Sequence, residues 1–121
     1  MAPPASALHV LVVDDESGVR GYMRLILESQ GCAVVEAEDG AHACRVMQQE
    51  SGNFNLVLTD VRMPRMDGPS LAKHVRERFP GIPVLFVSAS DAPAIPRSDL
   101  LPKPFRRQAL ITRVQELSNR R

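Results

Sequence analysis

The sequence predicts a small α/β protein in which five parallel strands form a doubly wound sheet with the order 2-1-3-4-5. Three observations support this fold class. Apolar, β-branched runs alternate with segments of helical periodicity, which favours parallel βαβ units. These runs are continuous, as expected for strands that are covered on both faces. The 121 residues are 44% hydrophobic and 24% charged, an ordinary composition for one globular core.

We expect one folded domain at residues 8–119, between short tails at 1–7 and 120–121. The first residues, MAPPASA, lack the basic and apolar segments of a signal peptide. No apolar run is long enough to cross a membrane, and the formal net charge of +1 gives no general attraction to nucleic acid or membranes. Cys32 and Cys44 lack a metal-binding spacing, so we expect reduced thiols and a cytoplasmic protein.

The first strand and helix are predicted from the start of the domain. The run LHVLVV at 8–13 predicts the first strand. Ser17 is the expected cap of the helix that follows, and Gly31 is expected to end it. The apolar stripe of this helix has a 3.6-residue spacing. It consists of Val19, Tyr22, Met23, Ile26, Leu27 and Gln30.

The middle of the chain continues the alternation. CAVVEA at 32–37 predicts the second strand, and a helix is expected at about 41–49. NLVLT at 55–59 predicts the third strand. Asp67 is expected to cap the next helix. The predicted core-facing residues of that helix are Leu71, Ala72, Val75 and Phe79.

The last elements are a strand, a short strand and a helix. IPVLFVS at 82–88 predicts the fourth strand, and DLLP at 99–102 predicts a short fifth strand. A final helix is expected from about residue 106 to 119. Its predicted core residues are Leu110, Val114 and Leu117.

Polar and charged residues follow the ends of four of these strands. They are Asp14, Asp15, Asp60, Ser88 and Lys103. Because the carboxyl ends of parallel strands meet at one edge of the sheet, we expect these residues to lie close together. Crowded carboxylates without His or Cys favour a hard cation such as Mg²⁺. The lysine and serine suit an anionic phosphoryl group, and an aspartate can itself be the nucleophile.

These five residues, in this order and on these strand ends, resemble the receiver domain of two-component response regulators. The segments LVVDDE, LVLTDVRMPRMDG, FVSAS and KPF all match its pattern, over about residues 8 to 118. The longer segment MDGPSLAKHVRERFPGIPVLFVSAS is similar to receivers attached to hybrid histidine kinases. The resemblance implies a flavodoxin-like fold. We expect either a stand-alone receiver or part of a larger protein.

The resemblance also implies how the acids act. Asp60 is expected to be the phosphoacceptor, which takes a phosphoryl group from the phosphohistidine of a sensor histidine kinase or a histidine phosphotransfer protein. Asp15, Asp60 and the backbone carbonyl of Arg62 are expected to bind Mg²⁺ directly, and Asp14 is expected to help through water.

Two further residues are expected to contact the phosphoryl group. Lys103 is expected to approach it together with the acceptor, and its bond to Pro104 is expected to be cis. Ser88 is expected to move toward a phosphoryl oxygen. The implied protein is a signalling domain, not an enzyme, that assists its own phosphorylation and dephosphorylation and switches partner binding. We expect a monomer without direct nucleic-acid binding or membrane insertion.

The chain departs from the family between the fourth and fifth strands. Receivers usually have a full helix there, but residues 89–98 must make the whole connection and they include Pro93 and Pro96. We therefore expect this fourth helix to be short or absent and 89–98 to form a mobile loop. The family's aromatic switch position is Leu100, which has no ring, so the usual partner surface is expected to be altered.

Two other functions remain open. A Mg²⁺-dependent phosphatase or phosphotransferase with an aspartyl-phosphate intermediate would use similar groups. Haloacid-dehalogenase-like enzymes place a D-x-D motif on the first strand, however, whereas Asp14 and Asp15 are adjacent. A receiver-like module that binds partners without phosphorylation is less consistent with five intact site positions. Turnover of a small phosphate ester would favour the enzyme, and a labelled protein that hydrolyses slowly would favour the switch.

Overall fold

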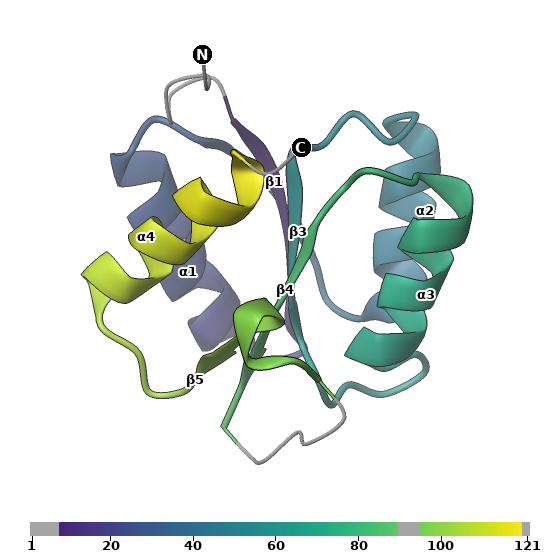
Figure 1. Ribbon diagram of the computed structural model, residues 1–121. Coiled ribbons are helices and arrows are strands. Elements are labelled where there is room, and N and C mark those ends of the chain that lie inside the picture. The colour runs from purple at the N-terminus through teal and green to yellow at the C-terminus, as the bar shows by residue number, and fades with distance from the viewer. Residues whose placement is uncertain (1–7, 90–94, 120–121) are drawn as a thin grey trace.

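The computed structural model describes residues 8–89 and 95–119, and it shows a parallel sheet between two layers of helices (Figure 1). The five-stranded sheet has the order β2-β1-β3-β4-β5, which confirms the predicted fold class. The strands are β1 (His9–Val13), β2 (Ala33–Ala37), β3 (Leu56–Asp60), β4 (Val84–Ser88) and β5 (Leu100–Pro102). The helices are α1 (Ser17–Ser29), α2 (Gly40–Gln49), α3 (Gly68–Arg78) and α4 (Arg107–Ser118), with a 3₁₀ helix, η2 (Arg97–Asp99).

Each face of the sheet carries its own hydrophobic cluster. Helices α1 and α4 cover one face, and α2 and α3 cover the other (Figure 1). Along β1, Val10 and Val12 belong to the first cluster, while Leu11 and Val13 belong to the second. This two-sided burial is the reason for the continuous apolar runs in the sequence. Tyr22, which belongs to the predicted apolar stripe, is instead 49% exposed.

Side-chain caps define two of the helix starts. Asp67 caps α3 as predicted, and Asp39 caps α2 in the same way, each accepting a hydrogen bond of 2.8 Å from the N–H three residues further on. The prediction that Ser17 caps α1 was wrong, because Ser17 is the first residue of the helix. The preceding Glu16 donates its N–H to a carboxylate oxygen of Asp14 (2.9 Å), and this turn leads the chain into α1.

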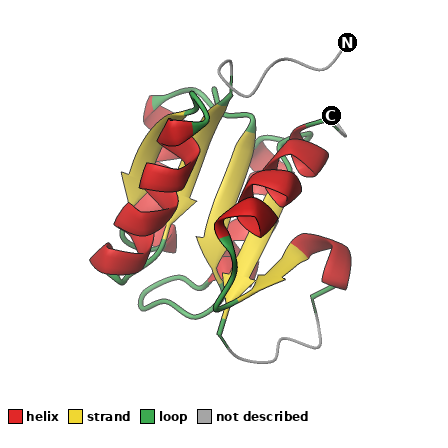
Figure 2. Cartoon of the chain, turned by 90° about the vertical axis from the view of Figure 1, so that its left-hand side faces the viewer, coloured by secondary structure: helices red, strands yellow, loops and turns green. Residues whose placement is uncertain are grey.

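The described part of the connection from β4 to β5 contains little helix. In its described part, residues 89 and 95–99, the single-turn helix η2 is the helical element, which agrees with the predicted short or absent helix (Figure 2). Arg113 of α4 donates hydrogen bonds to carbonyl oxygens of this region. The acceptors are Arg97 (3.3 Å), Ser98 (2.5 Å) and Leu100 (2.8 Å). The rest of the expected loop and both expected tails lie outside the described residues.

The strands all point toward one edge of the sheet, and this edge carries the predicted site (Figure 2). Helix α4 runs back from that edge, so the start of β1 and the end of α4 both lie at the opposite edge (Figure 1). Among the described residues, no helix has the length and apolar character needed to cross a membrane.

Candidate functional site

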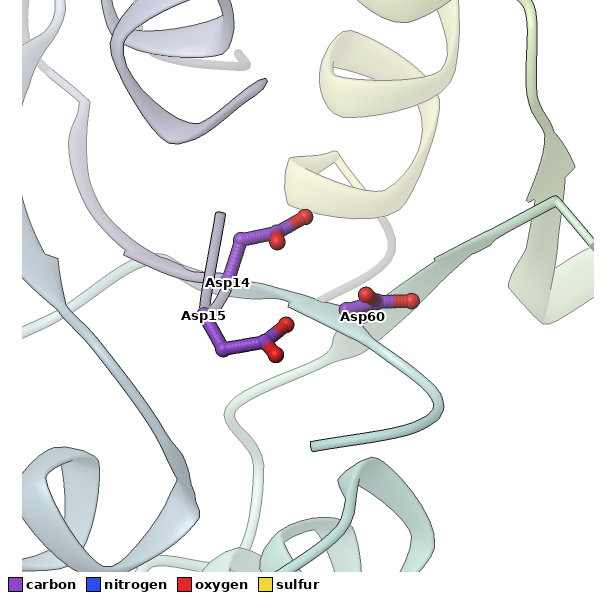
Figure 3. Close-up of side chains that lie close together, drawn as sticks. All are labelled: Asp14, Asp15 and Asp60. Atoms are coloured by element: carbon purple, nitrogen blue, oxygen red, sulfur yellow. The ribbon is translucent and has the colours of Figure 1, made fainter. Parts of the chain in front are cut away.

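Three carboxylates meet at the carboxyl edge of the sheet. Val13 of β1 pairs with Thr59 of β3, so the residues that follow them in the chain, Asp14 and Asp60, are neighbours. Each of Asp14, Asp15 and Asp60 offers an oxygen atom, and these oxygens all lie within 4.8 Å of one another. Figure 3 shows the Asp14 and Asp15 carboxylates extending toward the end of β3.

The three acids differ in their exposure to solvent. Asp14 is fully buried, Asp60 is 9% exposed and Asp15 is exposed. The cluster therefore has a buried base and an open side at Asp15. Its donor set is oxygen only, which suits a hard divalent cation and fits the predicted Mg²⁺ ligands.

Lys103 supplies the positive charge of the site. Its amine lies 3.1 Å from Oδ2 of Asp14 and 3.6 Å from Oδ2 of Asp60. Ser88 ends β4 and is 4% exposed, and its carbonyl oxygen accepts a hydrogen bond of 2.8 Å from the N–H of Lys103. The bond between Lys103 and Pro104 is cis, as expected. The structure thus places all five predicted strand-end residues at one edge.

The electrostatic environment disfavours a negative charge on Asp60. Burial and the neighbouring carboxylate of Asp14 raise the pKa of Asp60, and Asp15 acts in the same direction. The charge of Lys103 and a hydrogen bond from the N–H of Val61 (2.8 Å) lower the pKa but do not compensate fully. A cation bound beside Asp60 would relieve this repulsion.

The backbone at Asp60 is held by the start of α3. The N–H of Gly68 donates to the carbonyl of Val61 (2.8 Å). A Cβ atom added to Gly68 would lie only 2.3 Å from the carbonyl oxygen of Asp60, so only glycine allows this approach. The loop between β3 and α3, residues 61–67, leaves the site and returns to it here. It contains the exposed Arg62, whose predicted role as a carbonyl ligand stays a prediction.

Arg20 is a residue of this edge that the sequence analysis missed. Its Nη1 donates to the carbonyl oxygen of Asp14 (2.7 Å), and its Nε donates to Glu36 (2.8 Å). Hydrogen bonds from Arg24 and then Arg20 lower the pKa of Glu36, against the opposing effect of burial. Arg20 thereby links α1 and β2 to the backbone of the acid pair. No local pattern in the sequence indicates these contacts, because the partners of Arg20 are 6 and 16 residues away from it in the chain.

The sequence matches the response regulator receiver domain family over residues 10–115, and the chain belongs to this family. It is 41% identical over 115 residues to the sensor kinase CckA of Brucella abortus, a match that covers 89% of this chain and 12% of the kinase. It is 32% identical over 115 residues to the response regulator receiver protein CpdR of the same organism, covering 89% of this chain and 94% of CpdR.

Solved structures agree with this assignment. The receiver domain of the hybrid histidine kinase CckA has a TM-score of 0.79 and 33% identity to the chain, and the match covers 91% of this chain and 98% of that domain. A receiver domain from Clostridium thermocellum, at 23% identity and a TM-score of 0.84, shows the fold alone; it covers 93% of this chain and 95% of that one. Among curated relatives, the chain spans 12% of CckA and 51% of PetR from Rhodobacter capsulatus.

Proposed function

We propose that this receiver domain accepts a phosphoryl group on Asp60 and that the modification changes which partners it binds. The observation that carries the proposal is the Lys103 amine, which faces both Asp14 and Asp60 at the carboxyl edge (3.1 and 3.6 Å). In the transfer, a carboxylate oxygen of Asp60 bonds to phosphorus while the bond from phosphorus to the donor imidazole breaks. The electron pair of that bond returns to the imidazole.

The remaining site residues support this transfer in different ways. Asp14, Asp15 and Asp60, with the carbonyl of Arg62, would hold Mg²⁺, which when bound offsets the negative charge of the carboxylates and the phosphoryl oxygens. Lys103 provides a second positive charge toward the phosphoryl group. The buried end of β4 makes the Ser88 hydroxyl a suitable donor to a phosphoryl oxygen.

The proposed phosphodonor is a sensor histidine kinase or a histidine phosphotransfer protein. Relatives named as a sensor kinase and as a receiver protein support a donor of this kind. We propose that the output is a change in binding rather than turnover of a substrate, in the cytoplasm, by a monomer without direct contact to nucleic acid. A phosphatase that uses the same acids is the alternative, and it would hydrolyse a small phosphate ester repeatedly.

Labelling with acetyl phosphate tests the proposal. Intact-mass measurement should show one added phosphoryl group in the presence of Mg²⁺ and none in its absence. Asp60→Asn should remain unlabelled. Asp67→Asn is the matched control, because asparagine can keep the helix cap of α3, and it should label like the original protein. Equal labelling of Asp60→Asn would refute the assignment, and multiple turnover of p-nitrophenyl phosphate would favour the enzyme.

A further inference from the structure

The loop at residues 61–67 is tied to the start of α2 by an ion pair that the proposed reaction does not explain. Nε of Arg65 donates to Oδ2 of Asp39 (2.6 Å), 26 residues earlier in the chain. The Asp39 side chain is 2% exposed, whereas that of Arg65 is 63% exposed. Arg65 also has a positive φ of 67°, a conformation that is unfavourable for a residue with a side chain. The contact therefore accompanies an unusual shape of the loop backbone.

The two oxygens of Asp39 have separate tasks. Oδ1 accepts the capping hydrogen bond from the N–H of His42 (2.8 Å), and Oδ2 accepts from Arg65. Burial acts to raise the pKa of Asp39, but the hydrogen bonds from His42 and Arg65 together lower it. Asp39 is thus an ionised, fixed acceptor at a helix start, and Arg65 reaches it from the neighbouring loop.

Backbone contacts next to the ion pair hold the same loop. The N–H of Gly40 donates to the carbonyl of Met66 (3.2 Å), and a Cβ atom on Gly40 would lie 2.6 Å from that oxygen. The other side of the loop is fixed at Asp60 by Gly68. Arg62 lies between these two anchors, so its backbone position depends on both of them.

We propose that Asp39 and Arg65 are positioning residues that hold the 61–67 loop so that the Arg62 carbonyl faces the acid cluster. The inference rests on the proposed function, in which this carbonyl helps to bind the divalent cation. Neither side chain touches the cation or the phosphoryl group in this scheme. Both act through the backbone of the loop, as outer partners of metal ligands commonly do.

The direction in which Arg65→Ala changes the Mg²⁺ affinity distinguishes a positioning role from a simple effect of charge. Removing a positive charge from the loop that follows Asp60 by itself favours cation binding at the acid cluster. Arg65→Ala should therefore bind Mg²⁺ more tightly if only charge matters, and more weakly if Arg65 positions the loop. We expect about tenfold weaker binding, the lower end of the range for outer partners of metal ligands. Arg45→Ala, which removes an exposed arginine from α2, is the charge-matched control.

The experiment is a Mg²⁺ titration of the full 121-residue chain, followed by amide chemical shifts in NMR spectra. Arg65→Lys should recover part of the affinity, because lysine keeps the charge but not the planar geometry of the guanidinium. Amides of 61–67 should exchange faster in Arg65→Ala, and Tm should fall, because the buried Oδ2 of Asp39 loses its donor. Arg45→Ala should bind Mg²⁺ at least as tightly as the original protein.

A double-mutant cycle tests whether the two residues act together. Asp39→Asn can keep the cap of α2 and loses the ion pair, so the double variant Asp39→Asn/Arg65→Ala should bind Mg²⁺ no more weakly than the weaker single variant. Unchanged or tighter binding in Arg65→Ala would overturn the inference. If the original protein binds no Mg²⁺, or Asp15→Asn binds it equally well, the proposed cation site fails instead.

Discussion

Gly68 shows how a residue without a side chain can determine the position of the proposed phosphoacceptor, Asp60. It is the first residue of α3, and it lies against the backbone of Asp60. The carboxylate of Asp60 is directed by a strand end that this contact keeps in place. The proposed chemistry of the site therefore depends on a residue that contributes no functional group to it.

Gly68→Ala should damage both stability and the site. The added Cβ would lie 2.3 Å from the Asp60 carbonyl oxygen, so the backbone has to shift. Overpacking of this kind costs about 1–3 kcal/mol, which should appear as a lower Tm. Mg²⁺ affinity and labelling by acetyl phosphate should fall as well.

Gly21→Ala is the matched control for this change. A Cβ on Gly21 meets no atom within 4 Å, and alanine favours a helix over glycine by about 1 kcal/mol. This variant should be at least as stable as the original protein and should label normally. Normal Mg²⁺ binding by Gly68→Ala would show that the contact does not position Asp60.

Those residues of the candidate site that lie at the ends of strands could be predicted from the sequence. Asp14, Asp60 and Ser88 follow buried apolar runs, so the parallel topology alone brings them to one edge. Asp39 had a local signal, since an Asp-Gly pair before a helical stripe is typical of a helix start. Arg65 had no such signal. Arg65 meets Asp39 only because the folded chain brings its loop next to α2, and the spacing of residues along the sequence does not show this approach.

At the scale of elements, Arg113 fixes the described part of the connection from β4 to β5, in which the single turn η2 is the helical element. A full helix between β4 and β5 would pack against the sheet and fix the start of β5. Here the guanidinium of Arg113 spans three carbonyl oxygens of η2 and β5 instead. Its planar, multiple-donor geometry suits this arrangement.

Arg113→Ala should loosen this region more than the rest of the protein. Hydrogen bonds from charged groups contribute about 1.5–3 kcal/mol, so we expect a lower Tm. Amides of 97–102 should exchange faster, while those of β1 and β3 change little. Arg113→Lys should have a Tm and exchange rates between those of Arg113→Ala and the original protein, because an ammonium reaches fewer of the carbonyls at once. Uniform acceleration across the sheet, or no change at 97–102, would contradict this role.

The order of the elements followed from periodicity, but several boundaries did not. The fourth strand was predicted at 82–88, whereas β4 begins at Val84, after Pro83, which has no N–H to donate to a neighbouring strand. The cap of α1 was assigned to Ser17 because serine is a common cap. The carboxylate of Asp14 instead accepts the hydrogen bond that forms the turn before α1. The identity of one residue, Ser17, cannot reveal this contact.

For the whole molecule, cation binding should be coupled to folding. A ligand that binds only the folded protein stabilises it by about 2.7 kcal/mol at one hundred times its Kd. Mg²⁺ should therefore raise the Tm of the original protein above the value in NaCl of equal ionic strength. In the unfolded chain, Asp14, Asp15 and Asp60 are not held together, so we expect Mg²⁺ to bind the unfolded chain much more weakly than the folded protein.

Asp15→Ala separates cation binding from repulsion between the acids. This variant should bind Mg²⁺ much more weakly and lose most of the Tm increase. Without divalent cations it should melt no lower than the original protein, because an exposed member of a crowded acidic cluster has been removed. An equal Mg²⁺-dependent increase in both proteins would remove Asp15 from the cation site.

The positions of the start of β1 and the end of α4 have a practical consequence for experiments. The start of β1 and the end of α4 lie at the sheet edge opposite the acid cluster (Figure 1). A sensor chip or a fluorescent reporter attached next to the start of β1 or the end of α4 would leave the carboxylate edge on the far side of the sheet. Forms immobilised or dye-labelled in this way are therefore suited to measuring encounters with the proposed phosphodonor, since β1 begins and α4 ends away from the carboxylate edge.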